Sequence, residues 1–79
     1  MEDEARVAWK AALGVDDLPN DANFFELGGD SAAALSVILT LEDDYNIFVE
    51  PDILFGNAVF SDFVKALQAS VEDQKTFEI

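Results

Sequence analysis

Three stretches of this 79-residue chain repeat apolar residues every three or four positions, which is the spacing of one face of an α-helix. This spacing predicts one helix at residues 3–13, a second from Ser31 to about Asp44, and another from about Ala58 to Val71. No stretch alternates apolar and polar residues in the way that a half-buried strand would. The pattern therefore predicts an all-α fold built around one small core.

A fourth, shorter helix is expected between the second and third long ones. Pro51 or Asp52 would begin it and Gly56 would end it, because proline favours the first turn of a helix and glycine favours its end. The result is a small four-helix bundle that occupies residues 3–71, with a frayed tail at 72–79. The residues expected to face the core are Ala5, Ala8, Trp9, Ala12, Leu13, Ala34, Val37, Ile38, Leu41, Tyr45, Phe60, Phe63, Val64, Leu67 and Val71.

The composition excludes several classes of function. The chain has neither cysteine nor histidine, so it offers no disulfide, no thiolate metal site and no imidazole for acid–base catalysis. Its 17 acidic residues outnumber 4 basic ones, and a net charge of −13 opposes binding to nucleic acid or to anionic membranes. No apolar run is long enough to cross a bilayer. We therefore expect a soluble, cytoplasmic, monomeric protein whose partners present basic or apolar surfaces.

Residues 15–30 form a long loop that is expected to be functional, because loops of this length are unusual in small domains. The loop contains several large apolar residues that would pin it to the helices. Of Phe24, Phe25 and Leu27, at least two are expected to be buried. The loop ends with two glycines, Asp30 and Ser31, and the last two are both preferred residues at a helix N-terminus.

Each candidate catalytic or metal-binding motif in the sequence lacks a residue that its chemistry requires. The segment GDSAA lacks the second glycine of a nucleophile elbow, and no histidine is present to activate Ser31. No Gly-Lys pair forms a phosphate-binding loop, and the acidic segment DDLPNDANFFEL lacks the central glycine of a calcium loop. The acidic run at residues 42–44 is typical of a solvated surface. We expect no catalytic residue and no metal site.

The segment NFFELGGDS carries a specific resemblance to a known family. An aromatic pair, a glycine pair and a serine follow in the order and spacing found in the peptidyl carrier (thiolation) domains of nonribosomal peptide synthetases. These domains belong to the wider acyl carrier superfamily, and the resemblance extends over nearly all of residues 5–70. It implies that Ser31 is the attachment point of 4'-phosphopantetheine, derived from coenzyme A, with Gly28, Gly29 and Asp30 as the supporting loop.

The resemblance also implies which proteins this chain meets. A separate phosphopantetheinyl transferase would modify Ser31, and adenylation, condensation, acyl-transfer or tailoring enzymes would load and use the thiol of the attached arm. Partners would dock on the early part of the second helix. The matching positions are Ala32, Leu35, Ser36 and Leu39, of which Ala32 departs from the bulky apolar residue usual in the family. The alternative for both leucines is that they widen the buried stripe.

Two other functions stay open at this point. An acyl carrier of polyketide or fatty-acid synthesis is the runner-up within the carrier class, and the strong acidity would also suit it. An unmodified acidic interaction module would account for the charge but not for the Gly-Gly-Asp-Ser junction. Neither the cargo nor the choice between a freestanding protein and one domain of a larger chain follows from the sequence.

Overall fold

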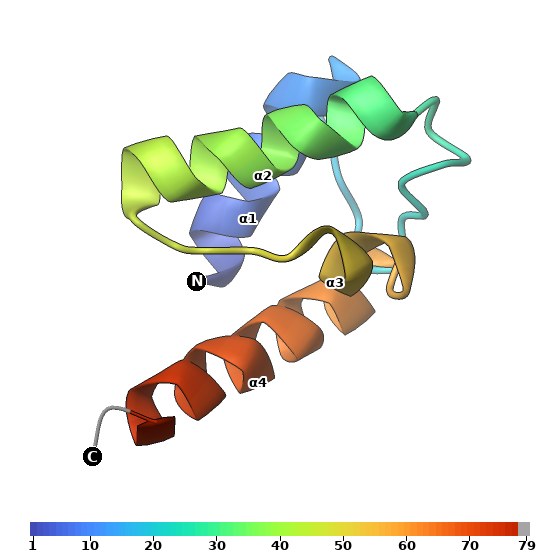
Figure 1. The fold of residues 1–79 in the computed structure, drawn as a ribbon. Coiled ribbons are helices and arrows are strands. Elements are labelled where there is room, and N and C mark those ends of the chain that lie inside the picture. The colour runs from blue at the N-terminus through green and yellow to red at the C-terminus, as the bar shows by residue number, and fades with distance from the viewer. Residues whose placement is uncertain (78–79) are drawn as a thin grey trace.

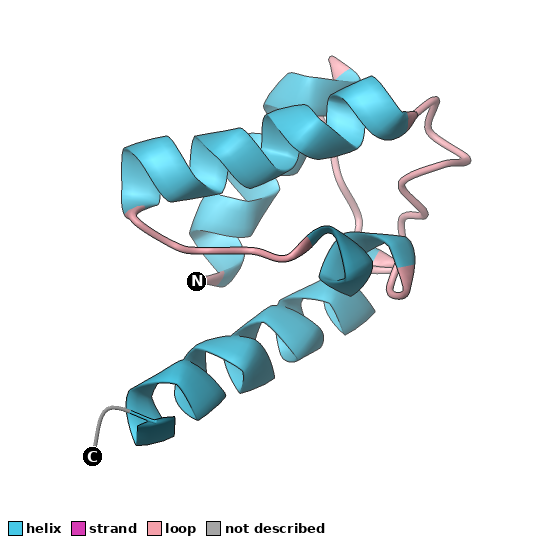
Figure 2. Ribbon diagram, viewed as in Figure 1, coloured by secondary structure: helices cyan, strands magenta, loops and turns pink. Residues whose placement is uncertain are grey.

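The computed structural model describes the backbone of residues 1–77 and the side chains of residues 1–71, and within these limits every regular element is a helix. The helices are α1 (Glu2–Leu13), α2 (Ser31–Tyr45), α3 (Pro51–Phe55) and α4 (Phe60–Phe77) (Figures 1 and 2). Over the described residues no strand forms, and the one β-bridge joins Asn23 to Val59. The predicted bundle of three long helices and one short helix is confirmed.

Local chemistry explains where the helices end. Gly14 adopts the left-handed conformation with φ 68° and donates its N–H to the carbonyl of Lys10, which ends α1 as predicted. Pro51 begins α3 and Gly56 follows it, also as predicted. The start of α4 is two residues later than expected because the N–H groups of Phe60 and Ser61 bond to loop carbonyls instead.

The end of α4 differs from the prediction. The sequence pattern placed the last helical residue at about Val71, whereas the helix continues to Phe77. The predicted frayed tail at 72–79 therefore contains helical backbone as far as Phe77, and residues 78–79 lie outside the described residues. In Figure 1 this part of α4 extends away from the other helices.

Trp9 lies at the centre of the core, surrounded by aromatic rings. Its ring centroid is 5.0 Å from that of Phe24 and 5.1 Å from that of Phe60, both in edge-to-face geometry, and 5.4 Å from that of Phe63. The helical residues that were predicted to face the core supply most of its remaining side chains. The buried residues are Ala5, Ala8, Trp9, Leu18, Ala22, Phe24, Ala34, Val37, Ile38, Leu41, Val49, Leu54, Phe60, Phe63, Val64 and Leu67.

The prediction that Tyr45 belongs to this core is wrong, since its side chain is 37% exposed. The backbone reverses at Asn46, which has φ 57°, and the N–H of Ile47 then donates to the carbonyl of Leu41. This turn brings Ile47 against the core and leaves Tyr45, the last residue of α2, at the surface.

Backbone hydrogen bonds hold the long loop against the start of α4. The N–H of Phe24 donates to the carbonyl of Ala58 at 2.8 Å, and the N–H of Phe60 donates to the carbonyl of Ala22 at 2.9 Å. Leu18, Ala22 and Phe24 are buried, so the loop is pinned as expected. The more specific prediction is wrong, because Phe24 alone is buried among Phe24, Phe25 and Leu27.

Candidate functional site

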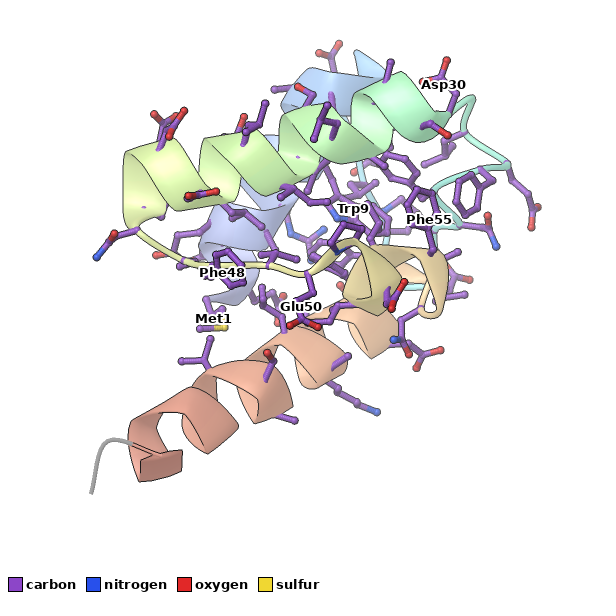
Figure 3. The ribbon with its side chains drawn as sticks, in the orientation of Figure 1. Met1, Trp9, Asp30, Phe48, Glu50 and Phe55 are labelled. Carbon is purple, nitrogen blue, oxygen red and sulfur yellow. The ribbon has the colours of Figure 1, made fainter. Side chains whose placement is uncertain are left out.

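Ser31 is the first residue of α2, and its side chain is exposed. The preceding residue, Asp30, has the extended backbone of a helix N-cap, and its Oδ1 accepts the N–H of Ala33 at 2.9 Å. The sequence left open which of the two residues caps the helix, and the structure assigns this role to Asp30. Among the described residues, no hydrogen bond engages the Ser31 hydroxyl. Figure 3 shows Asp30 at the junction of loop and helix.

A compact turn leads the chain to this junction. Asn23 Oδ1 accepts the N–H groups of Phe25 at 3.0 Å and of Glu26 at 3.1 Å, and its carbonyl accepts the N–H of Leu27 at 3.1 Å. Gly28 follows with φ 94°, a conformation that side chains with a Cβ rarely adopt. This turn reverses the chain and directs it back over Phe24.

Gly29 is required by a close contact with Phe24. A Cβ at Gly29 would lie 2.4 Å from two ring carbons of Phe24 and 2.6 Å from its carbonyl oxygen. The Gly29 N–H also donates to that carbonyl at 2.9 Å. Because the Phe24 ring packs on Trp9 in the core, this contact fixes the backbone two residues before Ser31. The packing of Phe24 therefore requires glycine at position 29.

The outer face of α2 runs from the Ser31 end toward the acidic end of the helix. Leu35 is 54% exposed and Leu39 is 47% exposed, so the alternative in which these leucines widen the core is wrong. A shallow depression follows this face. It is lined by Ala32, Leu35, Ser36, Leu39, Thr40, Asp43 and Asp44. The four positions singled out from the sequence are thus brought together, with two carboxylates at the far end.

The charge around the site has one sign. Residues 11–64 contain no lysine or arginine, and α2 has no basic residue in its last turn.

No group of three or more potential metal ligands occurs in the part of the chain that the structure describes. Over the same residues no helix is long and apolar enough to cross a membrane.

Two sets of contacts near the site were not predicted from the sequence. Arg6 joins α1 to the loop, because its guanidinium donates to the Leu18 carbonyl and to Asn20 Oδ1 and lies 4.6 Å from the Phe60 ring centroid. Phe25 stacks on Phe55 of α3. Both contacts join segments far apart in the sequence, so periodicity carried no signal for them.

Comparisons with known proteins agree with this geometry. The family described as "Phosphopantetheine attachment site" matches residues 3–67. Over 74 residues the chain is 38% identical to "Nonribosomal peptide synthetase 1" of Aspergillus fumigatus. This alignment covers 89% of this chain and 1% of the synthetase. The chain spans between 1% and 4% of the length of the curated relatives that it matches.

Two solved structures share the fold. A "Non Ribosomal PCP domain" aligns with a TM-score of 0.69 at 27% identity, over 78% of this chain and 79% of that one. A type-II acyl carrier protein from Streptomyces verticillus, described as involved in bleomycin biosynthesis, aligns with a TM-score of 0.79 at 20% identity. This second alignment covers 89% of this chain and 84% of the other, and it is a likeness of fold.

Proposed function

This chain belongs to the phosphopantetheine attachment site family, and from that premise we propose that Ser31 carries the 4'-phosphopantetheine arm. One observation supports this assignment above the others. Asp30 caps α2, so the exposed Ser31 hydroxyl is held at the helix N-terminus without a structural task of its own. Ser36, also exposed on α2, lacks this setting because it lies within the helix.

The residues around Ser31 suit the attached group. A phosphodiester on Ser31 Oγ would lie at the N-terminus of a 15-residue helix, where the helix dipole favours negative charge. The first turn of α2 contains no acidic residue, and the neighbouring Ala32 and Ala33 have no bulk to obstruct the group. When attached, the arm supplies a terminal thiol that carries an acyl or aminoacyl group as a thioester.

The modification itself requires a separate transferase. Ser31 Oγ forms a bond to the pantetheine-side phosphorus of coenzyme A, and the pyrophosphate P–O bond to that phosphorus breaks. The hydroxyl proton passes to a base of the transferase, and adenosine 3',5'-bisphosphate leaves. This chain contributes the nucleophilic oxygen and its position, since it contains no histidine and its lysines are not in the Ser31 loop. The domain acts as a carrier and not as a catalyst.

The favoured role is to carry aminoacyl or peptidyl groups in nonribosomal peptide synthesis. The supporting evidence is the NFFELGGDS segment, the 38% identity to a nonribosomal peptide synthetase and the likeness to a solved PCP domain. Adenylation, condensation and tailoring enzymes would dock on the α2 face that contains Ala32, Leu35, Ser36 and Leu39. Asp43 and Asp44 at the end of that face favour partners with basic surfaces.

An acyl carrier of polyketide or fatty-acid synthesis is the second candidate, and the net charge of −13 is the observation that favours it. Loading assays separate the two candidates. A peptidyl carrier accepts an amino acid from an adenylation enzyme with ATP, whereas an acyl carrier accepts a malonyl or acyl group from an acyltransferase. An unmodified interaction module would accept neither group and would gain no arm.

The attachment residue is tested by incubation with coenzyme A and a transferase of broad substrate range, followed by intact mass measurement. The parent and Ser36→Ala should each gain the mass of one phosphopantetheinyl group. Ser31→Ala should gain none while keeping the helical circular dichroism of the parent, because Asp30 still caps α2. An unchanged mass gain in Ser31→Ala would contradict the assignment.

A further inference from the structure

The carboxylate of Asp30 is bonded to the first turn of α2. Its Oδ1 accepts the N–H of Ala33 at 2.9 Å, and the Asp30 carbonyl accepts the N–H of Ala34 at the same distance. Within the described part of the chain, the N–H groups of Ser31 and Ala32 donate to no protein acceptor. This turn therefore has one N–H that depends on the Asp30 side chain and two that are open.

The arm proposed for Ser31 would bring a second negative charge to the same turn. A phosphodiester is an anion at neutral pH, and it would be bonded to the residue that directly follows Asp30. The open N–H groups and the helix dipole attract an anion toward the start of α2. The same approach brings it toward the Asp30 carboxylate, so the two anions compete for one helix end.

The surrounding loop offers no cation to neutralise these two charges. Residues 11–64 contain no lysine or arginine, and the other charged side chain of the turn before α2 is Glu26, which is acidic and exposed. Two unit charges about 4 Å apart repel each other in water by an energy similar to that of one N-cap hydrogen bond. The repulsion is therefore large enough to displace a cap.

The backbone on both sides of Asp30 is held in place. The Gly29 N–H donates to the Phe24 carbonyl at 2.9 Å, and the Phe24 ring lies where a Cβ of residue 29 would be. On the other side, the hydrogen bond from the Ala34 N–H fixes the Asp30 carbonyl. Because the Asp30 side chain is exposed, it is the part of this junction that is free to move (Figure 3).

We propose that attachment of the arm at Ser31 releases the Asp30 carboxylate from the Ala33 N–H, so that the modified and unmodified forms differ at the first turn of α2. Ala32 lies in this turn and Leu35 directly after it, and both line the depression on the outer face of α2. A partner that contacts this turn then distinguishes the two forms by the position of Asp30 as well as by the arm.

This inference rests on the proposed function, because it requires the arm to be on Ser31. Intact mass measurement shows whether the arm is attached before any other readout is taken. The absence of a mass gain at Ser31 would contradict the proposed function and the inference together. A mass gain with an unchanged Asp30 would contradict the inference alone and leave the carrier role intact.

The experiment measures the side-chain torsion χ1 of Asp30 from nuclear magnetic resonance couplings, before and after modification with coenzyme A and a transferase. In the unmodified protein one rotamer should dominate, because the carboxylate is bonded to the Ala33 N–H. In the modified protein the couplings should show averaging between rotamers. Asp30→Asn removes the charge but keeps a capping side chain, so it should show one dominant rotamer in both forms.

Asp43→Asn is the matched control for net charge. Residue 43 lies about 18 Å from residue 31 along α2, at 1.5 Å per residue, which is beyond the screening length at physiological salt. Attachment of the arm to this variant should release Asp30 as it does in the parent. A single Asp30 rotamer before and after modification of the parent, or equal averaging in Asp30→Asn, would overturn the proposal.

Urea denaturation gives an independent readout of the same cap. In the unmodified protein, Asp30→Ala should lower the folding equilibrium constant about 2- to 30-fold, because the N-cap is lost. In the modified protein the loss should be clearly smaller, since the cap is already released by the arm. Equal losses in the modified and unmodified forms would refute the coupling between Asp30 and the arm.

Discussion

Replacing Gly29 by alanine tests whether the contact with Phe24 fixes the approach to Ser31. The added Cβ would lie 2.4 Å from two carbons of the Phe24 ring, whereas carbon atoms in contact are usually about 3.5–4.0 Å apart. The ring must therefore withdraw by about 1 Å, or the loop must move by the same amount. Neither movement is easy, because the ring is fully buried against Trp9 and the loop amide is bonded to the Phe24 carbonyl.

Overpacking of this kind lowers the free energy of unfolding by about 1–3 kcal/mol. A domain of this size has a total stability of about 4–12 kcal/mol, so the loss should be plain in urea denaturation. Trp9 is the single tryptophan of the chain, and it contacts the Phe24 ring directly. Its fluorescence should therefore report both the unfolding transition and a shift of the ring in the folded state.

A double-mutant cycle gives the control for this prediction. Phe24→Leu leaves space at the point where the alanine methyl group would lie, so Gly29→Ala should be less destabilising in that background than in the parent. Gly28→Ala offers the comparison, since its Cβ would meet no atom within 4 Å and its effect would come from its φ of 94°. If Gly29→Ala unfolded like the parent, or lost the same stability in both backgrounds, the proposed role of this contact would be wrong.

Further predictions follow from the burial of individual side chains. Phe24→Ala should lower the free energy of unfolding by about 3–5 kcal/mol in urea denaturation, while Phe25→Ala should change it little. Asp30→Ala should lower it by about 0.5–2 kcal/mol through loss of the N-cap, and Asp30→Ser should restore most of that loss. Leu35→Ala should slow loading of the arm by a partner enzyme about fivefold or more at an almost unchanged melting temperature, with little dependence on salt. Asp43→Asn should slow association at low ionic strength only, and a salt-independent effect would contradict the electrostatic role.

The helices were predictable from the sequence because periodic burial leaves a local pattern. The start of α2 at Ser31 and the ends of α1 and α3 follow from capping residues that act within one turn. The pattern failed at Tyr45, which keeps the helical spacing but lies where the chain turns away from the core. A stripe shows which residues share a face, but it does not show where the neighbouring helices stop covering that face.

The loop was harder to predict because it has no period. Phe24 and Phe25 are chemically equal in the sequence, and the contacts that accompany burial of Phe24 are distant, such as the hydrogen bond from its N–H to the carbonyl of Ala58, 34 positions further along the chain. The need for Gly29 likewise depends on that ring, and not on local backbone preference. The resemblance in NFFELGGDS predicts Ser31 as the attachment residue without either contact, and the structure supplies the physical reason for the position of Ser31 at the start of α2.

The most direct test of this account is fragmentation mass spectrometry of the protein after modification by a transferase and coenzyme A. The account predicts one phosphopantetheinyl group, located on Ser31 at the exposed start of α2. The peptides that contain Ser36, Ser61 or Ser70 alone should have their unmodified masses. A group located on any of these three serines, or no group on a protein that is folded by circular dichroism, would contradict the central claim.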